Sequence, residues 1–264
     1  MGAVRFDVTD GVASIVLDNP EVHNAVDAPM REALENAYRQ VEADDDIRVA
    51  VISGGAEGKS FCSGGYIDGY QEVGAFGPEG VGPPKIPRPW PLWKPFIAAI
   101  RGYAVGGGFA LAITCDLRVV GRGARIGPSG LRRGAVQGAG QSQRLPRLIG
   151  ISKALELLLL SKYVDGEEAA RIGLANIVVN DDDVETTALD WARTIASYSP
   201  WAVARTKELV YRGFDMPFDE AMEWESAVAF EGYRRPEALE GFSAFTEGRE
   251  ARRTQSEGGV DAGQ

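Results

Sequence analysis

The sequence predicts an α/β fold in which strands and helices alternate along a spiral, and three observations support this class. Short runs that are β-branched or alternate between apolar and polar residues predict strands at 4–8, 13–17, 49–52, 96–100 and 117–120. Apolar residues at helical spacing follow some of these strands. The links between the elements are short, which favours an α/β spiral over an all-helical or all-β domain.

The first three elements form a hairpin followed by a helix. Residues alternate in Val4–Val8 and in Ala13–Leu17, and the Asp10-Gly11 pair between them is typical of a β-turn. Asp27, with Pro29 just inside, predicts the start of a helix. The predicted buried face of this helix comprises Met30, Leu34, Ala37 and Val41.

The middle of the chain continues the alternation. Val49–Ile52 is short and β-branched, which predicts a buried strand. Between Gly69 and Pro95 the composition shifts to glycine, proline and aromatic residues, which predicts a mobile loop. A second buried strand is expected at Phe96–Ile100, a helix at Phe109–Ile113 and a further strand at Leu117–Val120.

The remainder of the chain is predicted to be mainly helical. Residues 1–198 are predicted to form the spiral core, with a boundary near Ser199-Pro200, and 199–252 a helical region. The segment 253–264, with few apolar residues and Gly258-Gly259, is predicted to be disordered. Apolar residues at helical spacing predict helices at 151–160, 166–172, 184–197, 201–211, 218–233 and 236–248.

Composition excludes several classes of function. The chain has 264 residues and a formal net charge of −10, which argues against a general nucleic-acid binder because such binding rests on Lys and Arg. Cys62 and Cys115 lie in apolar stretches and are predicted to be buried thiols in a reducing compartment. No apolar stretch approaches the roughly 20 residues of a membrane span. No secretory signal is visible, so a cytoplasmic location is expected.

Three familiar motifs are incomplete in this sequence. Ser53–Ser60 resembles a phosphate-binding P-loop, but its first glycine is a serine and no helix opens at Gly58-Lys59-Ser60. Gly106–Gly108 lies where a dinucleotide fingerprint would lie, but Leu111 occupies the place of the third glycine. His23 is the only histidine, so a zinc site would have to use mostly carboxylates and distant cysteines, and a serine triad would depend on this one residue. The favoured interpretation of His23 is a loop residue without a catalytic role.

Two glycine-rich corners carry the chemistry that the sequence suggests. The first is Ser60–Gly65 and the second follows the predicted strand 96–100 and ends in Gly106–Gly108. Glycine lets a substrate approach the main chain closely, and the second corner also opens a helix, whose positive end favours a developing negative charge. Two backbone N–H groups aimed at one point would form an oxyanion hole.

These segments resemble the crotonase (enoyl-CoA hydratase/isomerase) superfamily over nearly the whole chain. The resemblance rests on Phe61-Cys62-Ser63-Gly64-Gly65, on Lys94–Gly108 and on Cys115-Asp116. It continues through Asp18-Asn19-Pro20 with Asn24-Ala25, Gly138–Arg147, Ala169–Ala175 and Glu240–Phe245.

The resemblance implies a spiral of ββα units that acts on acyl-CoA in fatty acid metabolism. The N–H groups of Gly65 and Gly107 would bind the thioester carbonyl oxygen and stabilise an enolate. It further implies a helical C-terminal region that assembles homotrimers or hexamers, with CoA as part of the substrate and with no bound cofactor or metal. The expected substrate-binding residues are His23, Ala25, Ser63, Gly65, Tyr66, Ile67, Asp68, Gly107, Gln137 and Phe245.

The chain departs from the family at the two glutamates that its hydratases use. Ala110 stands at the first position and Gly130, in a Ser-Gly pair, at the second. Neither residue titrates, so ordinary hydration should be lost or very slow. Asp68 and Tyr70 are the acid/base candidates, since burial could shift their pKa values.

Further candidate replacements are Tyr66 and Glu72, which follow the first corner, and Arg132, Arg133 and Gln137, which follow Gly130. An arginine there could hold a substrate carboxylate in bidentate fashion. The expected function is therefore a lyase, isomerase or hydrolase step on a CoA thioester, with a non-standard proton-transfer group. A non-catalytic acyl-CoA-binding protein is the alternative.

Overall fold

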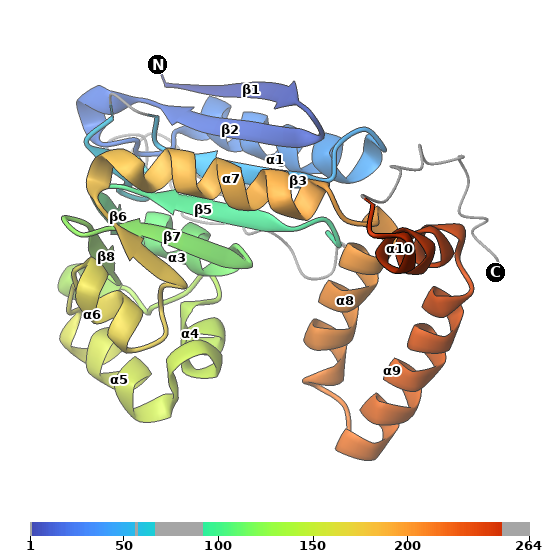
Figure 1. Ribbon diagram of the computed structural model, residues 1–264. Coiled ribbons are helices and arrows are strands. Elements are labelled where there is room, and N and C mark those ends of the chain that lie inside the picture. The colour runs from blue at the N-terminus through green and yellow to red at the C-terminus, as the bar shows by residue number, and fades with distance from the viewer. Residues whose placement is uncertain (1, 56–57, 67–91, 250–264) are drawn as a thin grey trace. The chain divides into compact units, whose positions relative to one another are not determined.

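The computed structural model describes residues 2–55, 58–66 and 92–249 (Figure 1). The chain divides into two compact units, Met1–Thr194 and Ile195–Gln264. The loop predicted between Gly69 and Pro95 lies outside the described residues apart from 92–95, and the tail predicted at 253–264 lies outside them entirely.

A six-stranded sheet forms the centre of the first unit, in the order β1-β2-β3-β5-β7-β9. The opening hairpin is antiparallel, as predicted, and every other neighbouring pair in this sheet is parallel. The five strands predicted from the sequence are confirmed within a residue or two. The strands are β1 (Ala3–Thr9), β2 (Val12–Asp18), β3 (Val49–Ser53), β5 (Phe96–Ile100), β7 (Leu117–Gly121) and β9 (Ile177–Val179).

A second, three-stranded parallel sheet was not predicted from the sequence. It comprises β4 (Ser60–Cys62), β6 (Tyr103–Val105) and β8 (Arg125–Gly127), paired in that order. Each of these strands follows a strand of the large sheet along the chain, so β3/β4, β5/β6 and β7/β8 are successive turns of one spiral. The predicted α/β spiral is therefore confirmed.

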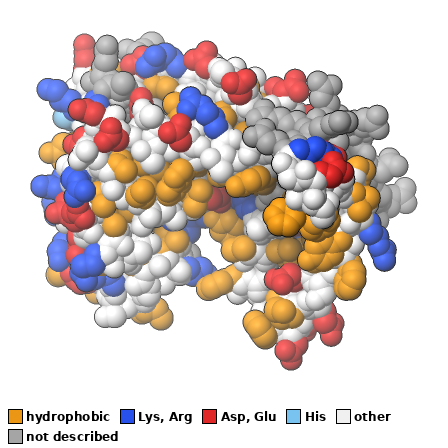
Figure 2. All heavy atoms as spheres, in the orientation of Figure 1, with side chains coloured by type: hydrophobic (Ala, Val, Ile, Leu, Met, Phe, Trp, Pro, Cys, Tyr) orange, Lys and Arg blue, Asp and Glu red, His pale blue; other side chains and the backbone are white. Residues whose placement is uncertain are grey.

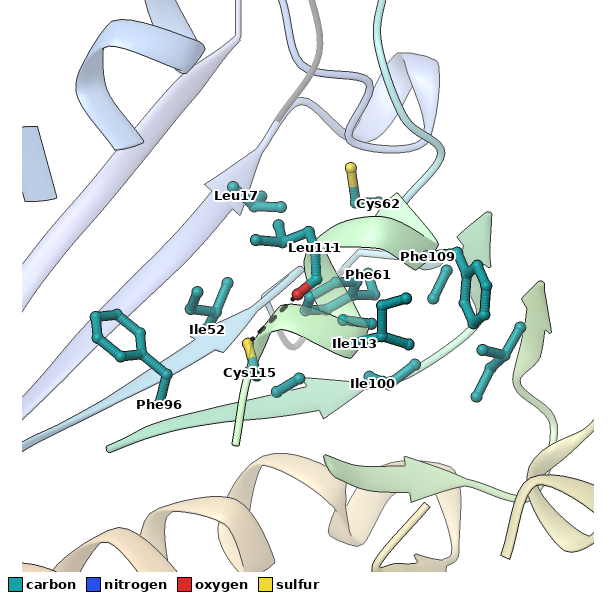
Figure 3. Close-up of a cluster of buried hydrophobic side chains, with 14 of the residues drawn as sticks. Leu17, Ile52, Phe61, Cys62, Phe96, Ile100, Phe109, Leu111, Ile113 and Cys115 are labelled. Carbon is teal, nitrogen blue, oxygen red and sulfur yellow. Dashed lines mark hydrogen bonds between the residues drawn. The ribbon is translucent and has the colours of Figure 1, made fainter. Parts of the chain in front are cut away.

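The helix α1 (Ala28–Ala43) covers one face of the large sheet, and α7 (Val184–Ala196) lies across the opposite face (Figure 1). As predicted, Asp27 caps α1, and its carboxylate accepts the Met30 N–H at 2.9 Å. The short helix α3 (Gly107–Thr114) is buried along most of its length, because its side chains belong to the hydrophobic core of the first unit. Figure 3 shows Phe109, Leu111 and Ile113 of α3 among the core side chains.

The remaining helices of the first unit follow the spiral. The predicted helices 151–160 and 166–172 are confirmed as α5 (Ile151–Leu160) and α6 (Gly166–Arg171). The helix α4 (Gln141–Ile149) was not predicted; it contains Pro146, a residue that normally argues against a helix. Three 3₁₀ turns lie at η1 (Pro20–Val22), η2 (Gly130–Arg133) and η3 (Asp181–Asp183).

The second unit is helical, as predicted, and consists mainly of α8 (Pro200–Gly213), α9 (Phe218–Tyr233) and α10 (Pro236–Glu247). Among the described residues of this unit only Ala196, Glu208 and Ala244 are buried. Many large apolar side chains of these helices lie at the surface instead (Figure 2). They include Val210, Phe214, Phe218, Met222, Phe230, Tyr233, Leu239, Phe242 and Phe245. No described helix is long and apolar enough to cross a membrane.

Candidate active site

The first glycine corner is held in place by the loop that precedes α1. The Ser63 N–H donates to the His23 carbonyl at 3.0 Å, and the Val26 N–H donates to the Gly64 carbonyl at 2.8 Å. The Tyr66 N–H donates in turn to the Val26 carbonyl at 3.0 Å. Gly65 therefore lies between two backbone hydrogen bonds that fix its orientation without using its own N–H.

Asn24 anchors this loop from inside the protein. Its side chain is buried, and its amide NH₂ donates to the carbonyls of Gly54 at 3.1 Å and Ser60 at 2.7 Å. Its carbonyl oxygen accepts the Asn19 N–H at 2.8 Å. One side chain thus ties the loop before α1 to the two ends of the segment that leads into the first corner.

The second corner meets the first by direct backbone contact. Gly106 has a φ of +57°, a conformation that favours glycine, and Gly107 is the first residue of α3. A Cβ added to Gly108 would lie 1.9 Å from the Cys62 carbonyl oxygen, so only glycine allows α3 to approach so closely. A Cβ added to Gly64 would lie 3.0 Å from the Gly107 nitrogen.

The N–H groups of Gly65 and Gly107 are the two predicted oxyanion donors. Within the part of the chain that the structure describes, neither donates a hydrogen bond to another residue. Gly107 also stands at the N-terminus of α3, where the helix dipole favours negative charge. The arrangement can bind an oxygen on which negative charge develops.

The positions of the two family glutamates lie beside this corner and carry no carboxylate. Ala110 is buried in the first turn of α3, and its N–H donates to the Gly106 carbonyl at 3.1 Å. A Cβ added to Gly130 would lie 2.8 Å from Gln137 Oε1 and 3.0 Å from the Ala135 carbonyl oxygen. The glycine therefore leaves room that Gln137 fills.

Several predicted binding residues line the first corner. His23 Nδ1 lies 3.0 Å from Ser60 Oγ, and its ring meets the edge of Tyr103 at 5.7 Å between centroids. Ala25 is buried, and the Ser63 hydroxyl donates to the Val22 carbonyl at 3.1 Å. These side chains hold the loop, which leaves the backbone of the corner to meet a ligand.

Two other predicted side chains are engaged within the protein. Gln137 is buried; its Oε1 accepts the Gly130 N–H at 3.1 Å and its NH₂ donates to Ser161 Oγ at 3.3 Å. Arg132 donates to the Ser161 carbonyl at 2.6 Å and stacks over the ring of Tyr163. Gln137 thus acts as an internal tie between the segment after Gly130 and the end of α5.

Arg133 is exposed in the turn η2, and the other candidates lie in the second unit or outside the described residues. Phe245 is 83% exposed on α10 of the second unit. Four candidates lie outside the described residues: Ile67, Asp68, Tyr70 and Glu72.

Two polar residues next to the second corner were missed by the sequence analysis. Ser129 and Gln141 are both buried and both lie against Gly106. Ser129 directly precedes Gly130, and Gln141 lies in the segment Gly138–Arg147 that carries the family resemblance; these placements were the available signal.

The first corner is also closed to water at its inner side. Cys62 is buried, and burial raises the pKa of its thiol from 9.0 to about 12, although the hydrogen bond with the Gly64 backbone opposes this rise. Figure 3 shows Cys62 above the core cluster that contains Phe61 and Phe109. The thiol is therefore a neutral packing group near neutral pH rather than a nucleophile.

A separate cavity of about 500 Å³ lies on the α7 face of the large sheet, and its lining includes neither Gly65 nor Gly107. Arg5, Asp18 and Glu185 give its lining charges of both signs. Over residues 2–55, 58–66 and 92–249 no group of three or more His, Cys, Asp or Glu side chains is placed to hold a metal ion.

Comparison with known proteins places this geometry in context. The family model described as enoyl-CoA hydratase/isomerase matches residues 7–256. The chain is 35% identical over 249 residues to an (E)-benzylidenesuccinyl-CoA hydratase from Thauera aromatica, covering 93% of this chain and 96% of that protein. It is 32% identical over 243 residues to a short-chain-enoyl-CoA hydratase from Clostridium acetobutylicum, covering 90% and 92%.

Solved structures give the same result. An enoyl-CoA hydratase from Mycobacterium tuberculosis H37Rv superposes with a TM-score of 0.87 at 30% identity, covering 95% of this chain and 98% of the other. A probable enoyl-CoA hydratase/isomerase from Mycobacterium abscessus has a TM-score of 0.83 at 33% identity, covering 94% and 97%.

Proposed function

The chain belongs to the enoyl-CoA hydratase/isomerase family, and on that premise we propose that it binds an acyl-CoA thioester and polarises its carbonyl through Gly65 and Gly107. The observation that carries the proposal is the contact between the two glycine corners. The Gly107 nitrogen lies 3.0 Å from the Cβ position of Gly64, the residue before Gly65.

The chemistry of the corner follows from where charge develops. When a base removes a proton from the carbon next to a thioester, negative charge moves to the carbonyl oxygen. Two fixed N–H donors stabilise that oxyanion more than the neutral carbonyl, and losing one such donor typically costs about 10²–10³ in rate. Gly65 and Gly107 thereby lower the barrier for a lyase or isomerase step at the α-carbon.

The proton-transfer group cannot come from the usual family positions, because Ala110 and Gly130 have no titratable side chain. Asp68 and Tyr70 remain the proposed acid/base pair. If either transfers the proton, Asp68→Asn or Tyr70→Phe should slow α-proton exchange by about 10²-fold or more without a matching loss of acyl-CoA affinity.

The experiment that tests the function measures binding and α-proton exchange together. Saturable binding of butyryl-CoA, with exchange of its α-protons in D₂O followed by mass spectrometry, is the expected result. The substrate panel should include enoyl, cyclic, branched and aryl-substituted dicarboxylic thioesters, since one relative is named for benzylidenesuccinyl-CoA. Absence of binding across the panel would contradict the proposal. Fast hydration of crotonyl-CoA by a variant lacking Asp68, Tyr70 and Glu72 would contradict the account of the missing pair.

A non-catalytic acyl-CoA-binding protein is the second candidate. The side chain that fills the space beside Gly130 favours it, because Gln137 is a neutral amide and a poor proton carrier. Binding without α-proton exchange or product on any thioester of the panel would support this role.

We also propose that the chain assembles as a homotrimer or a dimer of trimers through its second unit. The support is the set of exposed apolar side chains on α8, α9 and α10, which a monomer would leave in water. Sedimentation should give about three or six times the chain mass of 28.3 kDa. Phe245 is proposed to reach the CoA of a neighbouring copy, so Phe245→Ala should weaken binding of CoA thioesters.

Two further predictions remain open to test. The absence of a retained cofactor is checked by mass spectrometry of the purified protein in its native state. The cytoplasmic location is checked by fractionating cells that produce the full chain.

A further inference from the structure

The cavity on the α7 face of the large sheet lies over a row of three side chains on neighbouring strands. Arg5 of β1 pairs with Val16 of β2, and Val16 pairs with Ser53 of β3. Residues paired in this way point to the same face of a sheet, and all three line the cavity of about 500 Å³. This volume falls within the range of about 300–1,000 Å³ that is typical of small-molecule sites.

The Ser53 end of this row presents a buried hydroxyl group to the cavity. Ser53 is 5% exposed, and its Oγ accepts the Gly55 N–H at 3.2 Å. No residue that the structure describes accepts the proton of this hydroxyl. A buried hydroxyl whose proton has no acceptor lacks one hydrogen bond, and a ligand oxygen in the cavity would supply it.

The Arg5 end of the row presents a guanidinium group. Its Nε lies 3.2 Å from Asp18 Oδ2, and its two terminal nitrogens donate to no residue within the described ranges. Gly55 has no side chain to compete for the space beside them, since a Cβ added there would lie 3.4 Å from Arg5 Nη2 and 3.2 Å from Val16 Cγ1. The two terminal nitrogens of an arginine suit a carboxylate, which they bind in bidentate fashion. Arg5 and Ser53 therefore offer the cavity donors for a carboxylate.

The wall that α7 contributes to the cavity carries a carboxylate without a cation. Glu185 lies in the first turn of α7 and is half-buried. Its carboxylate forms no ion pair or hydrogen bond with any residue in the part of the chain that the structure describes. Leu189, one turn further along α7, and Val51 of β3 add apolar surface to the same cavity. A ligand with an ammonium group and an apolar chain would match this wall.

The lining favours a zwitterion over a phosphate group. Glycines of the P-loop-like segment Ser53–Ser60 line the cavity, but no helix opens there and the lining carries two carboxylates against one guanidinium. A zwitterion places its carboxylate at Arg5 and its ammonium group at Glu185, so both side chains gain a partner of opposite charge.

We propose that this cavity binds a free amino acid with an apolar side chain, whose carboxylate is held by Arg5 and Ser53 and whose ammonium group is held by Glu185. The lining of the cavity includes neither Gly65 nor Gly107. The site is therefore separate from the proposed thioester site and does not depend on it.

The first experiment compares three ligands that share an apolar chain. Norleucine carries both charged groups, hexanoate lacks the ammonium group and pentylamine lacks the carboxylate. Calorimetry on the full chain should show that norleucine binds more tightly than either of the others by about 10- to 100-fold, the typical contribution of a hydrogen bond to a charged group.

Substitutions in the lining should remove these contributions one at a time. Glu185→Gln should weaken norleucine to about the affinity of hexanoate and leave the Kd of hexanoate unchanged. Arg5→Gln should weaken norleucine to about the affinity of pentylamine and leave the Kd of pentylamine unchanged. Ser53→Ala should weaken norleucine and hexanoate about three- to tenfold, but not pentylamine. A merely structural role of these residues would change the affinities of all three ligands together.

Glu32→Gln is the matched control for Glu185→Gln. Glu32 is an exposed carboxylate on α1, which covers the opposite face of the sheet, so this variant should keep the wild-type affinity for norleucine. Equal losses of norleucine affinity in the two variants would overturn the proposal. Equal affinities of the wild type for the three ligands, or no binding of norleucine or of any other apolar amino acid, would overturn it whatever the variants show.

Discussion

The glycine corners respond differently to a change of sequence from the adjacent positions of the two family glutamates, Ala110 and Gly130, which we call the wall. In the corners the groups proposed to bind the substrate oxygen are backbone N–H donors, and close contacts such as that of Gly108 with the Cys62 carbonyl fix their positions. In the wall the groups that transfer protons in the family's hydratases are two glutamate side chains, and in this chain Ala110 and Gly130 stand in their places. Oxyanion binding therefore depends on backbone geometry, whereas proton transfer depends on two residue identities.

The largest expected effect comes from blocking the corner. Gly64 has a φ of +109°, and a methyl group there would lie 3.0 Å from the Gly107 nitrogen. Gly64→Ala should therefore strain the turn and obstruct the Gly107 N–H, with a loss of about 10²–10³ in α-proton exchange. A cinnamoyl-CoA chromophore, whose absorption moves to the red when its carbonyl is polarised, should lose that shift.

Gly173→Ala is the matched control for this substitution. Gly173 also has a positive φ, +78°, but the nearest atom to an added Cβ is 3.8 Å away, so only the backbone strain is shared. The control should keep the red shift and lose about 1 kcal/mol of stability. Equal loss of the shift in both variants would show that strain, not obstruction of the donor, explains the result.

The second effect is a gain of activity in the wall. The triple variant Ala110→Glu, Gly130→Glu and Gln137→Ala, in which the last change removes the side chain 2.8 Å from the new Cβ at 130, should raise crotonyl-CoA hydration about 10²-fold over the wild type. The same triple variant with glutamines at 110 and 130 is the control. If the variant with glutamines hydrates crotonyl-CoA as fast as the variant with glutamates, the absence of carboxylates does not explain the low hydration rate expected of the wild type.

Much of the fold could be predicted from the sequence, and there is a physical reason why the rest could not. The hairpin, the core strands and the amphipathic helices could be predicted because the apolar residues of each element, such as α1, repeat with the period of a strand or a helix. The strands β4, β6 and β8 have three residues each, too few to show a period. The helix α4, which begins at Gln141, was not predicted because Pro146 argues against a helix there.

The candidate site shows the same division. The glycine motifs identified Gly65 and Gly107, because backbone donors leave a signature of small residues. The approach of Gly64 to the Gly107 nitrogen joins segments about forty residues apart, which only the tertiary structure reveals. Ser129 and Gln141 escaped notice because their importance lies in a shared neighbour, Gly106, and in a carbonyl oxygen left without a donor.

The third effect concerns the anchor of the first corner. Asn24→Ala removes hydrogen bonds to the carbonyls of Gly54 and Ser60 and leaves the Asn19 N–H without its partner. The free energy of unfolding should fall by about 2–3 kcal/mol. Urea denaturation at a fixed protein concentration measures this loss.

Asn36→Ala provides the comparison for this anchor. Asn36 is exposed on α1 and its side chain accepts a surface hydrogen bond from Arg39, so its loss should cost less than about 0.5 kcal/mol. Similar losses in the two variants would mean that Asn24 does not anchor the corner.

The smallest effect tests whether the inner side of the corner stays dry. The pKa of the Cys62 thiol rises from 9.0 to about 12 on folding because the group is buried. Above pH 9 the unfolded chain therefore releases this proton while the folded protein retains it, so stability falls as pH rises from 9 towards 12. Between pH 8 and pH 10 the wild type should lose about 1.4 kcal/mol more than Cys62→Ala in urea denaturation. Parallel losses in the two proteins would mean that water reaches the thiol, and a corner open to water could not hold its N–H donors in the low-dielectric surroundings that oxyanion binding requires.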